Sequence, residues 1–102
     1  MPRDVSVGLL VRFEAKPGRE QDVVDLLRQG LSLVQEEPDT ARWFAIRFGP
    51  SSFGIFDAFP DEAGREAHLD GKVAQALQEN IGTLFEQPTF EQVDVLAERP
   101  PA

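Results

Sequence analysis

The chain has 102 residues and a formal net charge of −8, from 18 acidic and 10 basic side chains. A surface this negative repels nucleic-acid phosphates and anionic lipids, so we expect neither a nucleic acid nor a membrane as a partner. The absence of cysteine excludes disulfides, thiolate metal ligands and cysteine nucleophiles. With no signal-peptide pattern and no apolar stretch near the roughly 20 residues that span a bilayer, the sequence predicts a cytoplasmic protein. Its length fits one domain over 1–102, with a core over about 5–96.

The first predicted elements are a strand and a helix. Residues 5–13 alternate between apolar and mostly polar or small side chains, which is the period of a β-strand. Pro17 and Gly18 then break the chain. From residue 19 to residue 37, apolar side chains recur at intervals of three and four. This spacing predicts an amphipathic helix of about five turns that stops at Pro38.

Two strands and a second helical region follow. Residues 40–48 and 53–59 are typical of strands, and the short connection between them predicts an antiparallel hairpin. Asp61 is a plausible N-cap for a helical region that extends through Phe85 and stops before Pro88. Gly71 is expected to interrupt this region near its middle. Residues 89–96 form the last predicted strand.

The element order βαββαβ predicts an α+β ferredoxin-like fold with a four-stranded antiparallel sheet. Two helices can cover only one face of such a sheet. Both faces are nevertheless apolar, since Trp43 and Ala45 alternate with Phe44, Ile46 and Phe48. An uncovered apolar face of this size is rare in monomers, so we expect a homodimer that pairs through the helix-free face.

No pattern in the sequence indicates a cofactor. The single histidine cannot supply a metal-binding spacing, and no phosphate-binding glycine loop is present. We therefore expect no metal, haem or flavin, and a colourless protein.

Two side chains are candidates for acid–base chemistry. His68 could be a base in a pocket, because an imidazole titrates near neutrality, or it could be a histidine on the helix surface or a capped one in the core. Asp57 is an acid in the middle of an apolar strand, and a buried acid needs a partner or a raised pKa. It could accept a proton or anchor a ligand, or it could form an ion pair with Arg47 on the neighbouring strand.

The aromatic residues leave two alternatives open as well. Trp43 and the eight phenylalanines could line a pocket for an aromatic ligand. Aromatic side chains on strands are, however, more often ordinary core residues.

Several segments together resemble the antibiotic biosynthesis monooxygenase domain family of the dimeric α/β-barrel superfamily. The similarity covers roughly Val5 to Leu96. It is carried by Ala15-Lys16-Pro17-Gly18-Arg19-Glu20, Pro38-Asp39-Thr40, Phe56-Asp57-Ala58-Phe59-Pro60-Asp61-Glu62-Ala63 and Glu66-Ala67-His68-Leu69. The resemblance implies a dimeric α/β barrel with a ligand cavity between the sheet and the helices of each subunit. It also implies chemistry in which the substrate itself reduces oxygen while the protein supplies binding, deprotonation and a dry site.

The family's functional residues carry over only in part. Quinone-forming members use an asparagine and a tryptophan where this chain has Ile55 and Phe59. The positions used by haem-degrading members correspond to Val11, His68 and Gln78, so the iron-ligating histidine is missing. Many members have a second histidine after the His-Leu pair, and this chain has Asp70-Gly71-Lys72-Val73 there instead.

The function that the resemblance implies is a cofactor-independent monooxygenase for a small aromatic quinol or phenol. The predicted catalytic residues are His68, as proton shuttle, and Asp57. The predicted substrate-binding residues are Trp43, Arg47, Phe53, Ile55 and Phe59. One alternative is a homodimer that binds a small ligand without catalysis, and another is a purely structural dimer. Whether His68 and Asp57 share one cavity distinguishes the enzyme from the homodimer that only binds a ligand.

Overall fold

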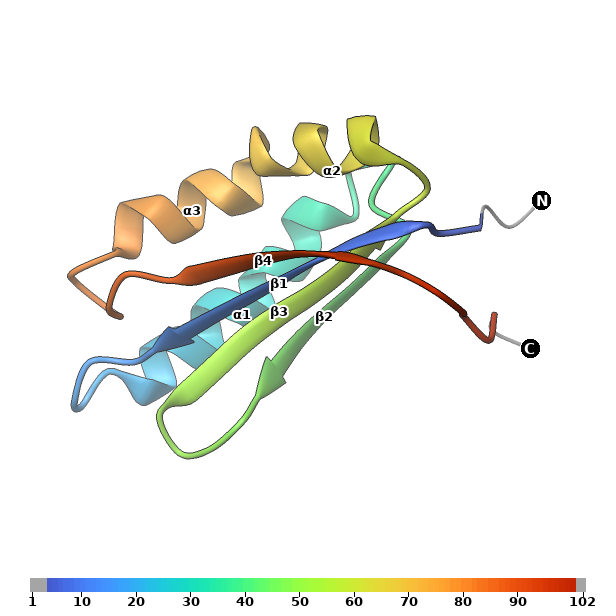
Figure 1. Cartoon of the computed structure of the whole chain (residues 1–102). Coiled ribbons are helices and arrows are strands. Elements are labelled where there is room, and N and C mark those ends of the chain that lie inside the picture. The colour runs from blue at the N-terminus through green and yellow to red at the C-terminus, as the bar shows by residue number, and fades with distance from the viewer. Residues whose placement is uncertain (1–3, 101–102) are drawn as a thin grey trace.

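The alternating segment near the N-terminus forms a central strand of a four-stranded antiparallel sheet. The computed structural model describes residues 4–100. The strand order is β2-β3-β1-β4, and the helices cover one side of the sheet (Figure 1). The elements are β1 (Val7–Glu14), α1 (Glu20–Val34), β2 (Arg42–Arg47), β3 (Ser52–Phe59), α2 (Glu62–Leu69), α3 (Lys72–Asn80) and β4 (Thr89–Asp94). The predicted α+β ferredoxin-like fold is therefore confirmed.

The register of the sheet separates a helix-facing side from an outer side. Leu9 on β1 lies opposite Asp57 on β3, and Phe13 lies opposite Phe53. Because side chains alternate across a strand, these residues point to the same face. That face forms the core together with apolar residues of the helices, and the buried cluster contains Leu9, Val11, Phe13, Ala15, Val23, Leu27, Phe53, Ile55, Phe59, Leu77 and Phe85.

The helices differ from the sequence prediction at their ends. The first helix stops at Val34, and residues 35–39 form a turn that leads to β2. The second region splits at Gly71 into α2 and α3, as the glycine predicts. The expectation that helix continues through Phe85 is wrong, because α3 ends at Asn80 and Phe85 forms a β-bridge with Ala15. Phe85 is fully buried, so its apolar character reflects the core and not a helical stripe.

No helix within residues 4–100 is long and apolar enough to cross a membrane.

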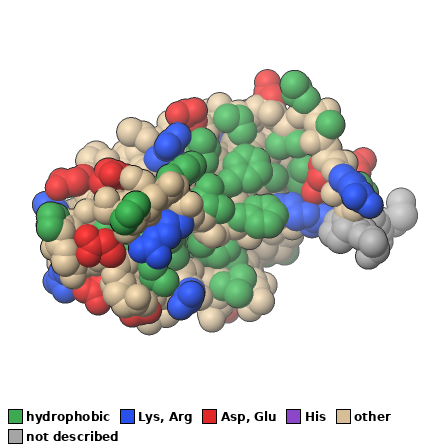
Figure 2. Space-filling view, turned by 90° about the horizontal axis from the view of Figure 1, so that it is seen from below, with side chains coloured by type: hydrophobic (Ala, Val, Ile, Leu, Met, Phe, Trp, Pro, Cys, Tyr) green, Lys and Arg blue, Asp and Glu red, His purple; other side chains and the backbone are tan. Residues whose placement is uncertain are grey.

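The outer side of the sheet exposes a group of apolar side chains. Phe44 and Phe56 lie opposite each other on β2 and β3, and Phe44 is 52% exposed. Figure 2, which views the molecule from below the orientation of Figure 1, shows hydrophobic side chains gathered on this surface. Phe48 is also exposed and carries the guanidinium of Arg12 over its ring, 4.0 Å from the centroid. Val95, Ala97, Glu98 and Arg99 of the C-terminal tail border a hollow that also includes Phe44 and Phe56, and Phe44 stays half exposed beside them.

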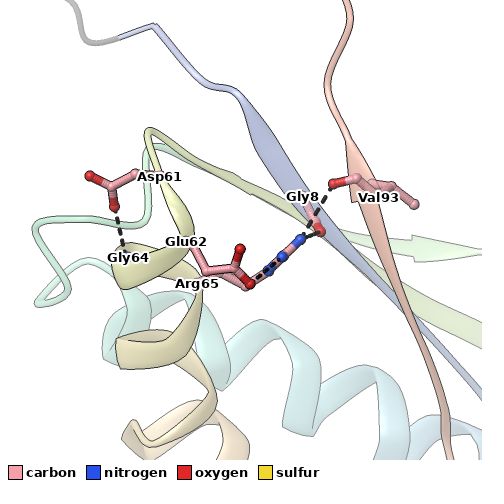
Figure 3. A network of polar contacts seen from close by, with 6 residues as sticks. All are labelled: Gly8, Asp61, Glu62, Gly64, Arg65 and Val93. Carbon is pink, nitrogen blue, oxygen red and sulfur yellow. Dashed lines mark hydrogen bonds and ion pairs between the residues drawn. The ribbon is translucent and has the colours of Figure 1, made fainter.

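A buried arginine that the sequence reading did not single out fastens α2 to the sheet. Arg65 Nη1 donates to the carbonyl oxygens of Gly8 at 3.1 Å and Val93 at 3.4 Å, which belong to neighbouring strands (Figure 3). Its Nη2 pairs with Glu62 Oε1 at 2.8 Å. Asp61 caps the same helix by accepting from the backbone N–H of Gly64 at 3.0 Å. The first turn of α2 is thus fixed at both its cap and its inner face, which determines where the next turn lies.

Arg65→Met should destabilise the protein while keeping the apolar stem of the side chain. The carbonyls of Gly8 and Val93 would lose their donor, and the free energy of unfolding should fall by about 1–3 kcal/mol. Urea denaturation followed by circular dichroism measures this change. Glu62→Gln removes only the exposed partner and should cost less than about 1 kcal/mol. Equal losses in the two variants would contradict a stabilising role for the carbonyl contacts.

Candidate functional site

Three ionisable side chains from three separate segments meet on the helix-facing side of the sheet. His68 on α2 lies between Asp57 on β3 and Glu37 in the turn after α1. The His68 Nδ1–H donates to Glu37 Oε1 at 2.6 Å, and Nε2 lies 2.8 Å from Asp57 Oδ2. Thr40 Oγ1 donates to the same Glu37 oxygen at 2.9 Å. The exposed fractions are 0% for Asp57, 5% for His68 and 19% for the Glu37 side chain, so the group runs from the interior toward the surface.

The local sequence explains how these side chains come together. Asp57 lies two residues from both Ile55 and Phe59, so the strand period places it with them on the helix-facing side. His68 follows Gly64 by one helical turn, and a Cβ at Gly64 would lie 3.2 Å from Asp39. The absence of a side chain at position 64 therefore lets α2 approach the turn that carries Glu37. At Gly71 a Cβ would lie only 2.8 Å from Glu37 Oε2, so this glycine leaves room for the carboxylate.

Burial and the neighbouring charges shift the pKa values of both Asp57 and His68. Burial raises the pKa of the Asp57 carboxyl, and the imidazole beside it only partly offsets that rise. For His68, burial alone would lower the pKa. The adjacent carboxylate of Asp57, together with the hydrogen bond and negative charge of Glu37, outweighs that effect, and the pKa of His68 is raised. A proton is therefore held in the group above the pH at which a free imidazole would lose it.

The inner end of the group has an unused acceptor. Asp57 Oδ2 is close to Nε2 but off the line of a conventional hydrogen bond, and Asp57 Oδ1 finds no donor among residues 4–100. A fully buried carboxylate oxygen without a donor is costly and uncommon in native proteins. The same oxygens belong to a side chain that lines a cavity, which makes Asp57 available to a bound molecule.

His68 separates two hollows of the protein. The inner one is a cavity of about 310 Å³ between the sheet and α3. Both Asp57 and His68 line it, and the other lining residues are Leu9, Val11, Ile55, Leu69, Asp70, Val73, Ala74, Gln75, Leu77, Gln78, Ile81, Pro88 and Phe90. The outer one, of about 140 Å³, lies on the Glu37 side of the imidazole and includes Glu36, Thr40 and Ala67. The imidazole thus has one nitrogen toward each hollow.

The structure brings together only some of the residues that the sequence singled out. His68, Asp57 and Ile55 line the 310 Å³ cavity. Trp43 lines a smaller neighbouring hollow of about 80 Å³, which shares Ile55 with the cavity. Phe53 and Phe59 are buried in the core and lie outside the cavity lining.

Arg47 lies apart from the cavity. Its guanidinium donates to the carbonyl oxygens of Gly49 and Pro50 in the hairpin and sits over the ring of Phe53. The expected ion pair with Asp57 is wrong, because Arg47 is in register with Phe53 while Asp57 is in register with Trp43.

Glu37 and the cavity wall formed by α3 were missed by sequence reasoning. Glu37 stands at the end of a helical pattern in a chain with 18 acidic residues, so nothing in its position distinguishes it. The only signal was the turn that follows, Pro38-Asp39-Thr40, which returns the chain toward the sheet. Within residues 4–100 no cluster of three or more histidine, aspartate and glutamate side chains has a geometry that could hold a metal ion.

Nuclear magnetic resonance of His68, the one histidine in the chain, should show a pKa above the ordinary value of about 6.5. Because the folded state binds this proton more tightly, the stability it contributes is complete below about pH 6.5 and is lost as the pH rises through the folded pKa. Glu37→Gln should lower the imidazole pKa and flatten this decline, since it removes the carboxylate 2.6 Å from Nδ1. Glu36→Gln is the control, because it removes the same charge one residue away and should change neither quantity. A wild-type pKa at or below 6.5 would contradict the assignment.

Comparison with known proteins shows the family and the fold of the chain. No family model and no curated protein matches the chain. Among solved structures, the NE2512 protein of unknown function from Nitrosomonas europaea is 50% identical over 96% of each chain, with a TM-score of 0.93. SnoaB, a cofactor-independent oxygenase from Streptomyces nogalater, is 13% identical over 96% of this chain and 100% of its own, with a TM-score of 0.72. An antibiotic biosynthesis monooxygenase is 19% identical over 89% of this chain and 99% of its own, with a TM-score of 0.76. The chain therefore belongs to the same family as the NE2512 protein, and it has the fold of the antibiotic biosynthesis monooxygenases.

Proposed function

We propose that the protein is a cofactor-independent monooxygenase that oxidises a small phenol or quinol in the 310 Å³ cavity. The observation that carries this proposal is the Asp57 carboxylate, which is fully buried, lines the cavity and has no conventional hydrogen-bond donor for either oxygen among residues 4–100. His68 lines the same cavity, which favours catalysis over simple binding. The fold shared with an oxygenase described as cofactor-independent is a second support.

The first step is removal of a proton from the substrate hydroxyl. Asp57 Oδ1 accepts this proton, and burial has already made the carboxyl a stronger base than an exposed aspartate. His68 stays behind it, with Nδ1–H bound to Glu37, and stabilises the negative charge of the carboxylate before the transfer. The sequence-based role of His68 as a free proton shuttle therefore becomes a supporting role, since both of its nitrogens already face carboxylates.

The oxidation that follows balances without any further reductant. The deprotonated ring gives electrons to oxygen, and a carbon–oxygen bond forms at the ring. One oxygen atom stays on the ring carbon, and the other leaves as water with two hydrogen atoms of the substrate. A quinol and one oxygen molecule thus give a hydroxyquinone and one water. The mostly apolar cavity limits access of bulk water to the reactive intermediate.

We also propose that the protein works as a homodimer assembled through the outer face of the sheet. Phe44, Phe48 and Phe56 lie on that face, and the first two are about half exposed. Apolar surface of this kind is stabilised by burial at about 25 cal/mol per Å². Pairing two copies through the same face gives a closed two-fold assembly without leaving a new apolar edge.

Asp57→Asn should reduce quinol-dependent oxygen uptake by at least about 100-fold, because the amide cannot accept the proton. His68→Ala should reduce it by at least about tenfold. An oxygen electrode with a panel of naphthoquinols and anthrones measures both variants, with Glu36→Gln as a control expected to match the wild type. Circular dichroism verifies that each variant is folded. An active Asp57→Asn variant would overturn the assignment of Asp57 as the base. A wild type without activity on any substrate would contradict the proposed enzyme and favour a protein that only binds a ligand.

Light scattering at micromolar concentration should give a mass of about twice 11.3 kDa. Phe44→Asp should produce monomers or aggregates, because it would bury unpaired charges in the interface at a cost of several kcal/mol. Leu31→Asp is the matched control, since Leu31 on α1 is 48% exposed but does not belong to the outer face of the sheet. A monomeric wild type would contradict the dimer, and so would equal effects of the two substitutions.

A further inference from the structure

The polar residues that line the cavity are acids and neutral amides, apart from one imidazole. Asp57, His68, Asp70, Gln75 and Gln78 line it, and no lysine or arginine of the described chain is among the lining residues. The only cationic group is the imidazole, and it already lies between the carboxylates of Asp57 and Glu37. A bound molecule therefore meets two carboxylates, two neutral amides that both donate and accept, and an imidazole already paired with carboxylates.

The inner and outer ends of the cavity both disfavour an anion. At the inner end, Asp57 Oδ1 lacks a donor, so a ligand hydroxyl would satisfy it and a second carboxylate would face it unpaired. Asp70, the exposed C-cap residue of α2, adds a second acidic side chain to the solvent-facing part of the lining. Beside Asp57, burying an unpaired charge costs several kcal/mol. At the exposed Asp70 the repulsion of an anion is weaker, because solvent screens it.

The size of the cavity limits the rest of the ligand. A volume of about 310 Å³ is at the lower end of the range for small-molecule sites. Apolar side chains from the sheet and α3 form most of the wall, as in Val11, Ile55 and Leu77. A cavity of this volume with such a wall suits a small, mostly apolar ligand.

We propose that the cavity selects uncharged aromatic hydroxyl compounds and rejects their carboxylate, sulfonate and phosphate counterparts, with Asp70 as a specificity-determining residue. This inference rests on the proposed function, because it assumes that the substrate occupies this cavity. It goes further by defining which phenols and quinols can enter.

The experiment compares two probes of the same size under anaerobic conditions, so that no oxidation takes place. One is a naphthohydroquinone bearing a carboxamide, and the other is the same ring bearing a carboxylate. Calorimetric titration should show the carboxylate binding at least about 100-fold more weakly. The fluorescence of Trp43, the one tryptophan of the chain, offers a second readout beside the cavity.

Charge reversal at the cavity separates a local effect from the overall negative charge of the protein. Asp70→Lys should narrow the difference between the two probes at least about tenfold. Glu66→Lys changes the net charge equally, on an exposed position of α2 outside the cavity lining, and should leave the difference unchanged.

Three results would overturn the inference. Equal binding of the two probes, or an equal effect of both lysine variants, would contradict it while leaving the proposed function intact. Binding of neither probe would contradict the inference and the proposed function together.

Discussion

The feature on which the site depends is a carboxylate that the strand period forces into the interior. Asp57 lies between Ile55 and Phe59 on the helix-facing side of β3, where an acid without partners would cost several kcal/mol. The protein offsets this cost only in part. His68 reaches Asp57 from α2 and is itself held by Glu37, so three segments far apart in the sequence meet at one imidazole.

Two buried charged residues in this small domain, Arg65 and Asp57, lie in different surroundings. Arg65 directs its terminal nitrogens to Gly8, Val93 and Glu62, which attaches α2 to the sheet. Its Nε has no partner within residues 4–100, but Arg65 lies outside the cavity lining. Asp57 instead keeps an oxygen free and lines a cavity. A polar atom that lines a cavity and lacks a hydrogen-bond partner can bind a ligand. The break between α2 and α3 at Gly71 completes the arrangement, because α3 then forms a wall of that cavity.

The sequence allowed the fold to be predicted more fully than the site. Period-two alternation in residues 5–13 and the hairpin connection near Gly49 are local signals, and both led to strands that exist. Phe85 was misplaced because an apolar residue at helical spacing cannot be told from one that returns to the core through a turn. His68 and Asp57 stood out as an unusual residue type and an unusual position. Glu37 could not stand out, since its role arises only from a contact 31 positions away in the chain.

The acidic cavity and the apolar outer face assign different roles to the two sides of one sheet. Under the proposed function, the helix-facing side, which holds Asp57, His68 and the cavity, would carry the chemistry. The outer side, with its exposed Phe44 and Phe48, would be the surface through which copies associate. This division follows from the alternation of each strand, because Asp57 and Phe56 are neighbours in sequence and point to opposite sides. Chemistry and assembly can therefore be altered separately by substitution.

The most direct test of the central claim is a crystal structure of the protein with a bound naphthol. The account predicts that the hydroxyl oxygen lies about 2.5–3.0 Å from Asp57 Oδ1, with the ring against the apolar wall of the cavity and the His68 contacts retained. A naphthol that occupies another hollow, or one that lies in the cavity with its hydroxyl turned away from Asp57, would contradict it.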